Sequence, residues 1–264
     1  MTETHDLRAD LRAHPGPLLV VTGAGISLAS GIPTFRGTDP GAVWNADVTE
    51  LGTRRYFERD PVGSWGWYLG RFGALRDKAP NPAHAALVAL ERSRAATGEA
   101  FLLVTQNIDG LHRAAGSGRL IEVHGSAHFV RCAETGCSNG APAGKLSRDA
   151  ADFTAFLAAP SRHTLPTCPA CGHFLRPHVL WFDEFYTDHA DYQYGAVAAA
   201  VEVAAVLVFV GTSFSVGVTA RLLDRARARR IPCWSIDPAG DRPAPHVRVL
   251  AEKAEVALPA LLAG

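Results

Sequence analysis

The chain has 264 residues, of which 47% are hydrophobic, and its 26 Lys and Arg balance its 26 Asp and Glu. A chain of this length forms one large domain or two modest ones, and its apolar content supports a substantial core. The balanced charge offers no basic surface to nucleic acid or an acidic membrane, and no apolar run reaches the ~20 residues that cross a bilayer. We therefore expect neither nucleic acid nor membrane as a partner. The oligomeric state stays open, and a monomer is compatible with the sequence.

The first 15 residues are polar and amphipathic, with Leu7 and Leu11 one helical turn apart. They lack the apolar core of a signal peptide. Four of the five cysteines stand in two close pairs, and in a chain without a secretion signal such pairs indicate a metal site rather than disulfides. The sequence therefore predicts a cytoplasmic location.

An apolar run followed by glycines comes next. Leu18–Thr22 is predicted to be a buried strand, and Gly23-Ala24-Gly25 follows it, where missing side chains let a backbone approach a ligand. Ser27 is expected to open a helix whose N-terminal N–H groups hold an anion. Gly31-Ile32-Pro33 ends that helix early, and Phe35-Arg36 returns toward the same place. The pattern predicts a nucleotide site with a lid.

Two alternatives bear on this turn. In the simplest one the glycines serve packing alone. The other is the ordinary dinucleotide fingerprint, Gly-x-Gly-x-x-Gly with an acidic residue about 20 residues further on. Here the third glycine is Gly31, and Asp39 and Asp47 lie in a segment interrupted by glycine and proline. A standard dehydrogenase is therefore disfavoured.

Further strand-like and helical patterns follow along the chain. The other predicted strands are Phe101–Thr105, Leu120–Val123, Ala205–Val210 and Ile231–Ile236. Several are apolar throughout, as expected of parallel strands covered on both faces. The predicted helices are Ala83–Ala95, Val216–Arg229 and Ala254–Leu262. Together they predict an α/β fold with a Rossmann-like, doubly wound parallel sheet.

Two segments do not fit that sheet and are predicted to form a smaller inserted lobe. Residues 38–82 are rich in Trp, Tyr and Arg and indicate short helices and loops, whereas residues 126–176 hold the paired cysteines. This division assigns residues 1–37, 83–125 and 177–264 to the Rossmann-like domain. The small lobe then combines a helical segment with a four-cysteine module.

Polar groups follow two of the predicted strands. Gln106, Asn107 and Asp109 come after the second strand, and His124 comes after the third. Ligands of open α/β sheets bind outside the carboxyl ends of the strands, so these side chains are candidate site groups. A neutral histidine there can act as a general base near pH 7, and Gly125 is expected to keep the space beside it open. The alternatives are a helix-capping role for Asp109 and a purely structural histidine.

The last two predicted strands also end in polar turns. Gly211-Thr212-Ser213 closes the strand that ends at Val210 and suits phosphate or ribose hydroxyls. Asp237 closes the strand that ends at Ile236, where a carboxylate can accept hydrogen bonds from a ribose diol.

The four paired cysteines have the spacing of a metal site. Two short knuckles, Cys132-x4-Cys137 and Cys168-x2-Cys171, can supply four thiolates to one tetrahedral Zn²⁺. Four thiolates close the coordination shell, so the ion is expected to be structural rather than catalytic. Cys233 lies in an apolar strand and is expected to be a core residue.

Taken together and in this order, the segments resemble the sirtuins, the family of NAD-dependent protein lysine deacylases. The matching segments are Gly-Ala-Gly-Ile-Ser at 23–27, Gly-Ile-Pro-Thr-Phe-Arg at 31–36, Thr-Gln-Asn-Ile-Asp at 105–109, His124-Gly125, the four cysteines and Gly211-Thr212-Ser213. The resemblance implies a Rossmann-type domain and a zinc-and-helical lobe, with NAD and an acylated lysine meeting between them. It also implies the NAD-binding residues Gly23, Ala24, Gly25, Ser27, Phe35, Arg36, Gln106, Asn107, Ile108, Asp109, Gly211, Thr212, Ser213, Asp237 and Ala254.

The resemblance further implies a catalytic set of Asn107, Asp109 and His124. The acyl oxygen would attack C1′ of the nicotinamide ribose, and His124 would then take a proton from a ribose hydroxyl. The products would be nicotinamide, free lysine and an O-acyl-ADP-ribose. A closed cleft would limit premature attack by water.

One short motif resembles the sirtuin class that removes succinyl, malonyl and glutaryl groups. Tyr68-x-x-Arg71 could hold a distal carboxylate, and Gly52, 16 positions before the tyrosine, would widen the acyl pocket. The alternative is that Tyr68 and Arg71 merely lie one turn apart on a helix. Deacetylation therefore remains a second hypothesis, in addition to the removal of acidic acyl groups.

The chain departs from the family pattern at three places. Asp183 stands where the family has Gly between Phe182 and Glu184, in the segment that pairs with the substrate peptide. Val218-Thr219 replaces Pro-Ala, and Asp237 replaces an Asn, which favours NAD over NADP. Asp183 puts peptide affinity in doubt and keeps open an NAD glycohydrolase or ADP-ribosyltransferase. A non-enzymatic NAD sensor is disfavoured by the intact Asn, Asp and His set.

Overall fold

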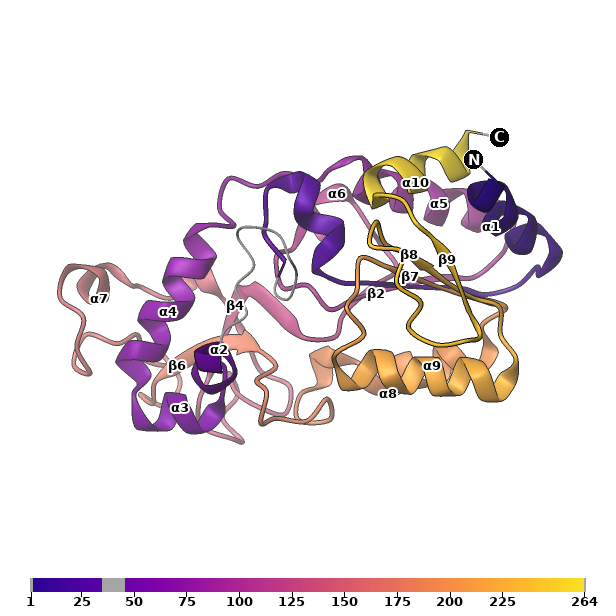
Figure 1. Ribbon diagram of the computed structural model, residues 1–264. Coiled ribbons are helices and arrows are strands. Elements are labelled where there is room, and N and C mark those ends of the chain that lie inside the picture. Colours follow the sequence, from indigo (N-terminus) through magenta and orange to yellow (C-terminus); the bar gives the residue numbers. More distant parts are fainter. Residues whose placement is uncertain (1, 35–45, 264) are drawn as a thin grey trace.

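The computed structural model describes residues 2–34 and 46–263, and its larger part is built on a six-stranded sheet (Figure 1). The strand order is β3-β2-β1-β7-β8-β9, and every pairing is parallel. The strands are β1 Leu18–Thr22, β2 Phe101–Thr105, β3 Leu120–Glu122, β7 Val206–Val210, β8 Cys233–Ile236 and β9 Val247–Leu250. The predicted doubly wound parallel sheet is therefore confirmed.

Helices cover both faces of this sheet (Figure 1). The helices α1 Thr2–Ala13, α5 Pro82–Ala96 and α10 Ala254–Leu262 lie on one face, and α8 Tyr194–Val203 and α9 Gly217–Arg229 lie on the other. Leu18 and Val20 of β1 join the core on the first face, while Leu19 and Val21 join the core on the second. This two-sided burial explains why the strand is apolar throughout.

Local signals explain most element bounds. Helix α5 begins after Asn81, whose side chain accepts the Ala83 N–H at 2.9 Å, and Pro82 occupies the first helical position. Strand β9 was not predicted, because it is a four-residue edge strand whose second residue, Arg248, is exposed. Helix α8 was not predicted either, because its apolar residues, mostly Ala and Val, do not recur with the period of a helix.

A second, three-stranded sheet forms the core of a smaller lobe with helices around it (Figure 1). Its strands are β4 Gly125–Cys132, β5 Leu146–Ser147 and β6 Leu175–Val179 in the antiparallel order β5-β4-β6, and the helices are α2 Ala46–Leu51, α3 Arg54–Arg59, α4 Pro61–Gly73 and α7 Thr154–Ala158. Trp65 of α4 is fully buried there, and its Nε1–H donates to the Leu175 carbonyl at 2.8 Å. The bounds given above for the two domains stay a prediction.

A buried ion cluster ties this lobe together. Glu184 accepts from Arg131 at 3.2 Å, from Arg176 at 3.0 Å and from the Trp181 N–H at 3.1 Å. Both guanidinium groups are 2% exposed and the carboxylate is 3% exposed. Although burial by itself raises the pKa of Glu184, the charges of Arg176 and Arg131 hold that pKa below its usual value.

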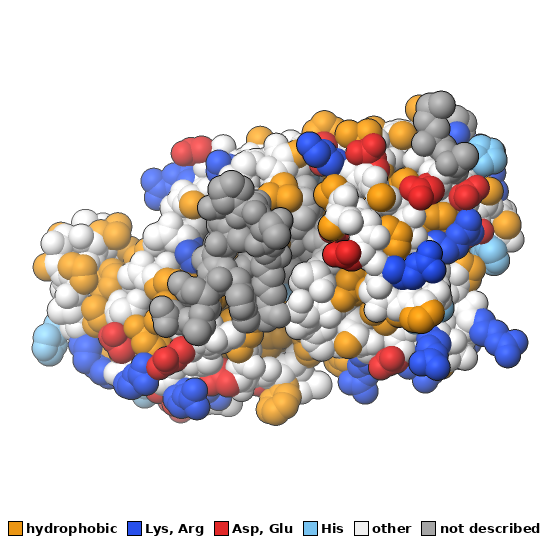
Figure 2. Space-filling model, in the orientation of Figure 1, with side chains coloured by type: hydrophobic (Ala, Val, Ile, Leu, Met, Phe, Trp, Pro, Cys, Tyr) orange, Lys and Arg blue, Asp and Glu red, His pale blue; other side chains and the backbone are white. Residues whose placement is uncertain are grey.

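Within residues 2–34 and 46–263, no helix is both long and apolar enough to cross a membrane. On the face shown in Figure 2, acidic and basic side chains are interspersed. The sequence prediction that neither membrane nor nucleic acid is a partner stays a prediction.

Candidate functional site

The strand order reverses direction between β1 and β7, which pair directly in the middle of the sheet. In doubly wound sheets, ligands bind outside the carboxyl ends of the strands at such a switch point. Thr22 ends β1 and Val210 ends β7, and the two residues are in register. Both strands run directly into the glycine turns singled out from the sequence.

The two glycine turns contact each other. The Gly25 N–H donates to the Gly211 carbonyl at 2.8 Å. A Cβ at Gly25 would lie 2.7 Å from the Gly211 Cα, and one at Gly23 would lie 2.7 Å from the Gly211 oxygen. The missing side chains therefore let two backbones meet at the switch point, as the packing alternative proposed. The role of Gly23 and Gly25 toward a ligand stays a prediction.

The helix after β1 differs from the expected one. It is a 3₁₀ helix, η1, that spans Ala24–Ser30 and ends at Gly31 with φ of 75°. Ser27 lies inside it and is fully buried, so it does not open the helix as predicted. Phe35 and Arg36, the predicted lid residues, lie outside the described residues.

The loop after β2 brings polar groups onto this turn. Asn107 Nδ2 donates to the Gly23 carbonyl at 3.0 Å and lies 3.2 Å from the Ser27 hydroxyl. That hydroxyl donates to one carboxylate oxygen of Asp109 at 2.7 Å, and the other oxygen accepts the Leu111 N–H at 2.9 Å. Asp109, which precedes the N-cap Gly110, thus binds the first N–H of the short helix α6, Leu111–Ala115, and also fixes η1. The capping alternative and the site alternative are compatible.

Gln106 and Ile108 anchor the same loop on both sides. Gln106 Nε2 donates to the Thr212 hydroxyl at 3.1 Å, which links the turn after β2 to the turn after β7. The Ile108 carbonyl accepts the Ala127 N–H of β4 at 2.9 Å. The loop therefore joins the large sheet to the small one.

Threonines hold this loop from the core side. The Thr105 hydroxyl accepts from the Asn107 N–H at 3.1 Å and from the Thr22 hydroxyl at 2.9 Å. The Thr22 oxygen in turn lies 2.9 Å from Nε2 of the buried His112. Because Thr22 donates to Thr105, its oxygen accepts from His112 Nε2–H. The backbone of Asn107 is thus fixed by a chain of buried hydrogen bonds.

His124 lies at the same edge of the sheet, between β3 and β4. Its Nδ1 lies 2.9 Å from the Gln106 carbonyl, and its Nε2 lies 3.1 Å from the Tyr186 hydroxyl. Burial lowers the pKa of His124 to about 4, against a smaller raising effect of the Gln106 carbonyl. The imidazole is therefore neutral at pH 7, as a general base must be.

The sequence predicts that Gly125 keeps space open beside His124, and this prediction is wrong. Its φ is 78°, and a Cβ there would lie 2.2 Å from the His178 carbonyl oxygen of β6. The Leu180 N–H donates to the His124 carbonyl at 2.9 Å. The glycine is needed because the neighbouring antiparallel strand β6, which pairs with β4 at Gly125 and Val179, lies against it. The hydrogen bond from Leu180 fixes the backbone of His124.

Comparisons with known proteins agree with this arrangement. The Sir2 family model matches residues 23–218. The NAD-dependent protein deacylase 2 of Pyrobaculum aerophilum is 35% identical over 258 residues, which are 96% of this chain and 93% of that protein. This chain belongs to the Sir2 family.

Two further relatives support the assignment to Sir2. The NAD-dependent protein deacylase of Thermus thermophilus is 46% identical over 172 residues, which are 65% of this chain and 60% of that protein. The match thus spans about three fifths of the length of the Thermus relative. A solved Sir2 homologue in complex with NAD is 34% identical, with a TM-score of 0.78 over 98% of this chain and 92% of that chain.

The other predicted NAD contacts of this Sir2 protein have different surroundings. Ser213 is exposed, and its hydroxyl accepts from Ser215 at 3.0 Å. Asp237 is partly exposed, and one carboxylate oxygen accepts the Ala239 N–H at 3.0 Å. Ala254 is buried at the start of α10, with 5% of its surface exposed. Their roles toward NAD stay predictions.

The predicted acyl-binding residues lie in the small lobe. Tyr68 and Arg71 share α4, and the Tyr68 hydroxyl accepts from Trp181 Nε1–H at 2.7 Å. Arg71 is partly buried beside Trp67, 4.9 Å from its ring centroid, and burial lowers its pKa. Gly52 was expected to widen the acyl pocket, but it does not. A Cβ there would lie 2.9 Å from the Phe182 ring, which fills the space.

The segment predicted to pair with the peptide is firmly attached to the small lobe. The Phe182 N–H donates to the Gly52 carbonyl at 3.0 Å. Asp183, the departure from the Sir2 pattern, accepts the Arg54 N–H at 2.7 Å and the Arg55 N–H at 3.1 Å, and so caps the start of α3. The Glu184 carboxylate is occupied by Arg131 and Arg176, and its N–H donates to the Trp181 carbonyl at 3.1 Å, so neither group is available to a peptide.

The four cysteines come together as predicted. The Sγ atoms of Cys132, Cys137, Cys168 and Cys171 all lie within 4.8 Å of one another. Asn139 Nδ2 lies 3.5 Å from the Cys168 sulfur, and the Glu134 N–H lies 3.4 Å from the Cys132 sulfur. Four sulfur donors with N–H groups directed at them fit a closed, tetrahedral structural Zn²⁺ site of this Sir2 protein. Cys233 is buried in the core, as predicted.

Removing one sulfur from this cluster is expected to abolish stoichiometric zinc binding. Cys171 is the exposed member, so Cys171→Ser changes the metal site with little effect on packing. Elemental analysis of purified protein should find a single zinc ion per chain in the wild type and much less in the variant. Cys233→Ala is the control and should keep its zinc. Equal zinc contents in wild type and Cys171→Ser would contradict the assignment.

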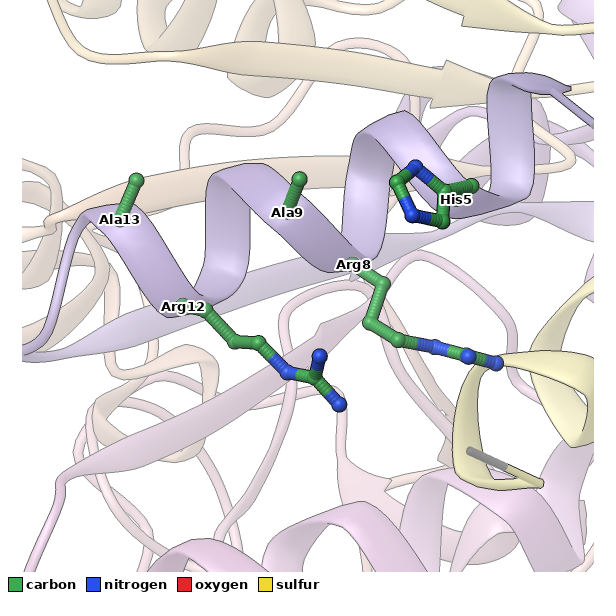
Figure 3. A pocket seen from close by; sticks show the side chains of 5 residues that line it. All are labelled: His5, Arg8, Ala9, Arg12 and Ala13. Carbon is green, nitrogen blue, oxygen red and sulfur yellow. The ribbon is translucent and has the colours of Figure 1, made fainter.

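Two other features of the described residues are not sites. His178, His189 and Asp191 approach within 4.8 Å, but His189 accepts the Asp191 N–H at its Nδ1 and lies 3.1 Å from the Gly144 carbonyl at its Nε2, so neither nitrogen is available to a metal. A hollow of about 550 Å³ lies beside α1 (Figure 3), far from the switch point (Figure 1). Arg8, which lines it, extends toward α10 and donates to the Ala260 carbonyl.

Proposed function

We propose that this chain is an NAD-dependent protein lysine deacylase. The products would be nicotinamide, O-acyl-ADP-ribose and free lysine. The observation that carries the proposal is the neutral His124 at the sheet edge that also holds Asn107 and the turn from Gly211. The relatives named NAD-dependent protein deacylases and the Sir2 homologue bound to NAD support it.

The residues have separate tasks in this proposal. NAD, when bound, supplies the electrophilic ribose carbon and the hydroxyl that finally carries the acyl group. Asn107, held by Gly23 and Ser27, would orient the ligand at the switch point. His124 Nε2 would take the proton of a ribose hydroxyl, because its other nitrogen is engaged by the Gln106 carbonyl.

The alternative of an NAD glycohydrolase or ADP-ribosyltransferase loses its main support. That alternative rested on Asp183, but this carboxylate accepts the first two N–H groups of α3. Cleavage of NAD alone also has less need of a base beside the ribose hydroxyls.

Mass spectrometry of a reaction with NAD and an acyl-lysine peptide tests the proposal. O-acyl-ADP-ribose and deacylated peptide are the expected products. Free ADP-ribose with intact acyl peptide would mean a glycohydrolase, peptide-attached ADP-ribose would mean a transferase, and unchanged NAD would mean a sensor. Any of these three results would overturn the proposal.

We propose further that the preferred acyl group carries a carboxylate. Tyr68 and Arg71 lie one turn apart on α4, and the Tyr68 hydroxyl keeps its own hydrogen to donate after accepting from Trp181. Burial lowers the pKa of Arg71, so a nearby carboxylate would stabilise its charge. Succinyl-, malonyl- and glutaryl-lysine in proteins are the proposed substrates.

Arg71→Met is expected to lower kcat/KM for a succinyl-lysine peptide by about 10- to 100-fold, the value of hydrogen bonds to a charged group. The acetyl-lysine peptide should be affected far less, because it lacks the carboxylate. Arg59→Met is the matched control, since Arg59 lies in the same lobe but is exposed and paired with Glu50. A wild type that prefers acetyl-lysine, with no change in Arg71→Met, would sink the acidic preference.

The cytoplasm remains the proposed location. Five free cysteines, four of them clustered as thiol ligands, favour a reducing compartment.

A further inference from the structure

Tyr186, in the segment after β6, contacts the proposed base directly. Its hydroxyl lies 3.1 Å from His124 Nε2, and the two rings stack with centroids 5.7 Å apart and planes inclined by 26°. Nothing in the sequence pattern singles it out, because it is one of three tyrosines in its segment and lies 62 residues from the histidine.

The direction of this hydrogen bond follows from the partners. A carbonyl oxygen only accepts, so His124 Nδ1 carries the hydrogen that reaches Gln106. In a neutral imidazole, Nε2 then holds a free lone pair, and Tyr186 donates to it. Burial raises the pKa of Tyr186 to about 12, so the phenol keeps its hydrogen at any pH the enzyme meets.

Tyr186 is itself held in place from behind. Its ring stacks on Tyr194 of α8 at 4.9 Å with an inclination of 18°. The Tyr194 hydroxyl accepts from Arg221 of α9 at 3.0 Å. The stack therefore connects His124 to the helical layer on one face of the large sheet.

We propose that Tyr186 is a positioning residue for His124. Its hydroxyl and the Gln106 carbonyl together select the tautomer in which Nε2 is the basic nitrogen, and its ring fixes the plane of the imidazole. Because Nε2 has a single lone pair, the Tyr186 O–H turns away from it before a ribose hydroxyl can donate there. The ribose O–H bond then breaks, an N–H bond forms at Nε2, and the electron pair stays on the ribose oxygen for its attack on the acyl carbon. The inference rests on the proposed deacylase function.

Tyr186→Phe tests the proposal because it removes the hydroxyl and keeps the stack. We expect kcat for deacylation to fall about 5- to 10-fold, the loss of one hydrogen bond, with the KM values for NAD and peptide unchanged. Exchange of labelled nicotinamide into NAD, which precedes the need for a base, should be unchanged. Tyr194→Phe is the matched control: it keeps the ring stack, loses only the bond to Arg221 and should leave kcat unaffected.

A readout independent of turnover separates this inference from the proposed function. The ¹⁵N spectrum of histidine-labelled protein, assigned with His124→Gln, should show an unprotonated Nε2 whose shift changes in Tyr186→Phe and not in Tyr194→Phe. An unchanged shift, an unchanged kcat, or an equal fall of exchange and deacylation would overturn the positioning role. A third combination of results separates the two proposals. If the Nε2 shift changes in Tyr186→Phe while the wild type forms no O-acyl-ADP-ribose, the proposed function is refuted and the positioning of His124 by Tyr186 stands.

Discussion

His124→Ala is expected to lower kcat for deacylation by about 100- to 10,000-fold, the usual contribution of a positioned general base. Nicotinamide exchange should continue, because the base acts only after the bond to nicotinamide is broken. Parallel measurement of O-acyl-ADP-ribose formation and of exchange checks both expectations. His163→Ala, an exposed histidine of the small lobe, is the control and should match the wild type.

The pH dependence gives an independent check on His124. An ordinary histidine has a pKa of about 6.5 and is mostly protonated at about pH 5.5. Burial lowers the pKa of His124 to about 4, so the base stays neutral as the pH falls to that point. The deacylation rate should therefore hold between about pH 7 and about pH 5.5. A rate that falls with a midpoint at the ordinary histidine value would contradict the lowered pKa of His124. A fully active His124→Ala would refute the assigned base.

Glu184→Gln is expected to destabilise the protein by about 3–5 kcal/mol, because it leaves two buried guanidinium charges without a counter-charge. Arg131 and Arg176 are each 2% exposed, so solvent cannot replace the carboxylate. The folded-state pKa of Glu184 is lowered, so its contribution is present at neutral pH and is lost as the pH falls through that folded-state pKa.

Chemical denaturation at pH 7 measures this effect. Glu202→Gln is a matched control, because Glu202 also binds two arginines, Arg225 and Arg229, but does so at the surface. Surface pairs of this kind contribute little, and the control should unfold close to the wild type. Equal stabilities of wild type and Glu184→Gln would mean that the buried cluster does not support the small lobe.

Much of the fold was predictable because its signals are local. The apolar strands β1 and β2 have the bounds that their sequence predicts, since two-sided burial demands an uninterrupted apolar run. Short strands such as β9 and the uniformly small-residue helix α8 carry no such period and were missed. The cysteine spacing was equally informative, because zinc fixes both the number and the type of its ligands.

The residues of the candidate site also include some that were predictable from the sequence and some that were not. Asn107, Asp109 and His124 were predictable, because polar residues after parallel strands gather at one edge of the sheet. Their neighbours were not. The Phe182 ring beside Gly52 and the Tyr186 hydroxyl on His124 depend on how a distant segment returns to the site.

The sequence by itself determined the family, the parallel sheet and the cysteine cluster, because each is recorded in the type, spacing and order of residues along the chain. Only the tertiary structure decided what the glycines at 23, 25 and 125 accommodate, how Asp183 and Glu184 are used, and which group holds the base. These depend on contacts between segments far apart in the chain. The type of a residue limits which contacts it can make but does not specify them, because the path of the backbone decides which distant residue lies next to it.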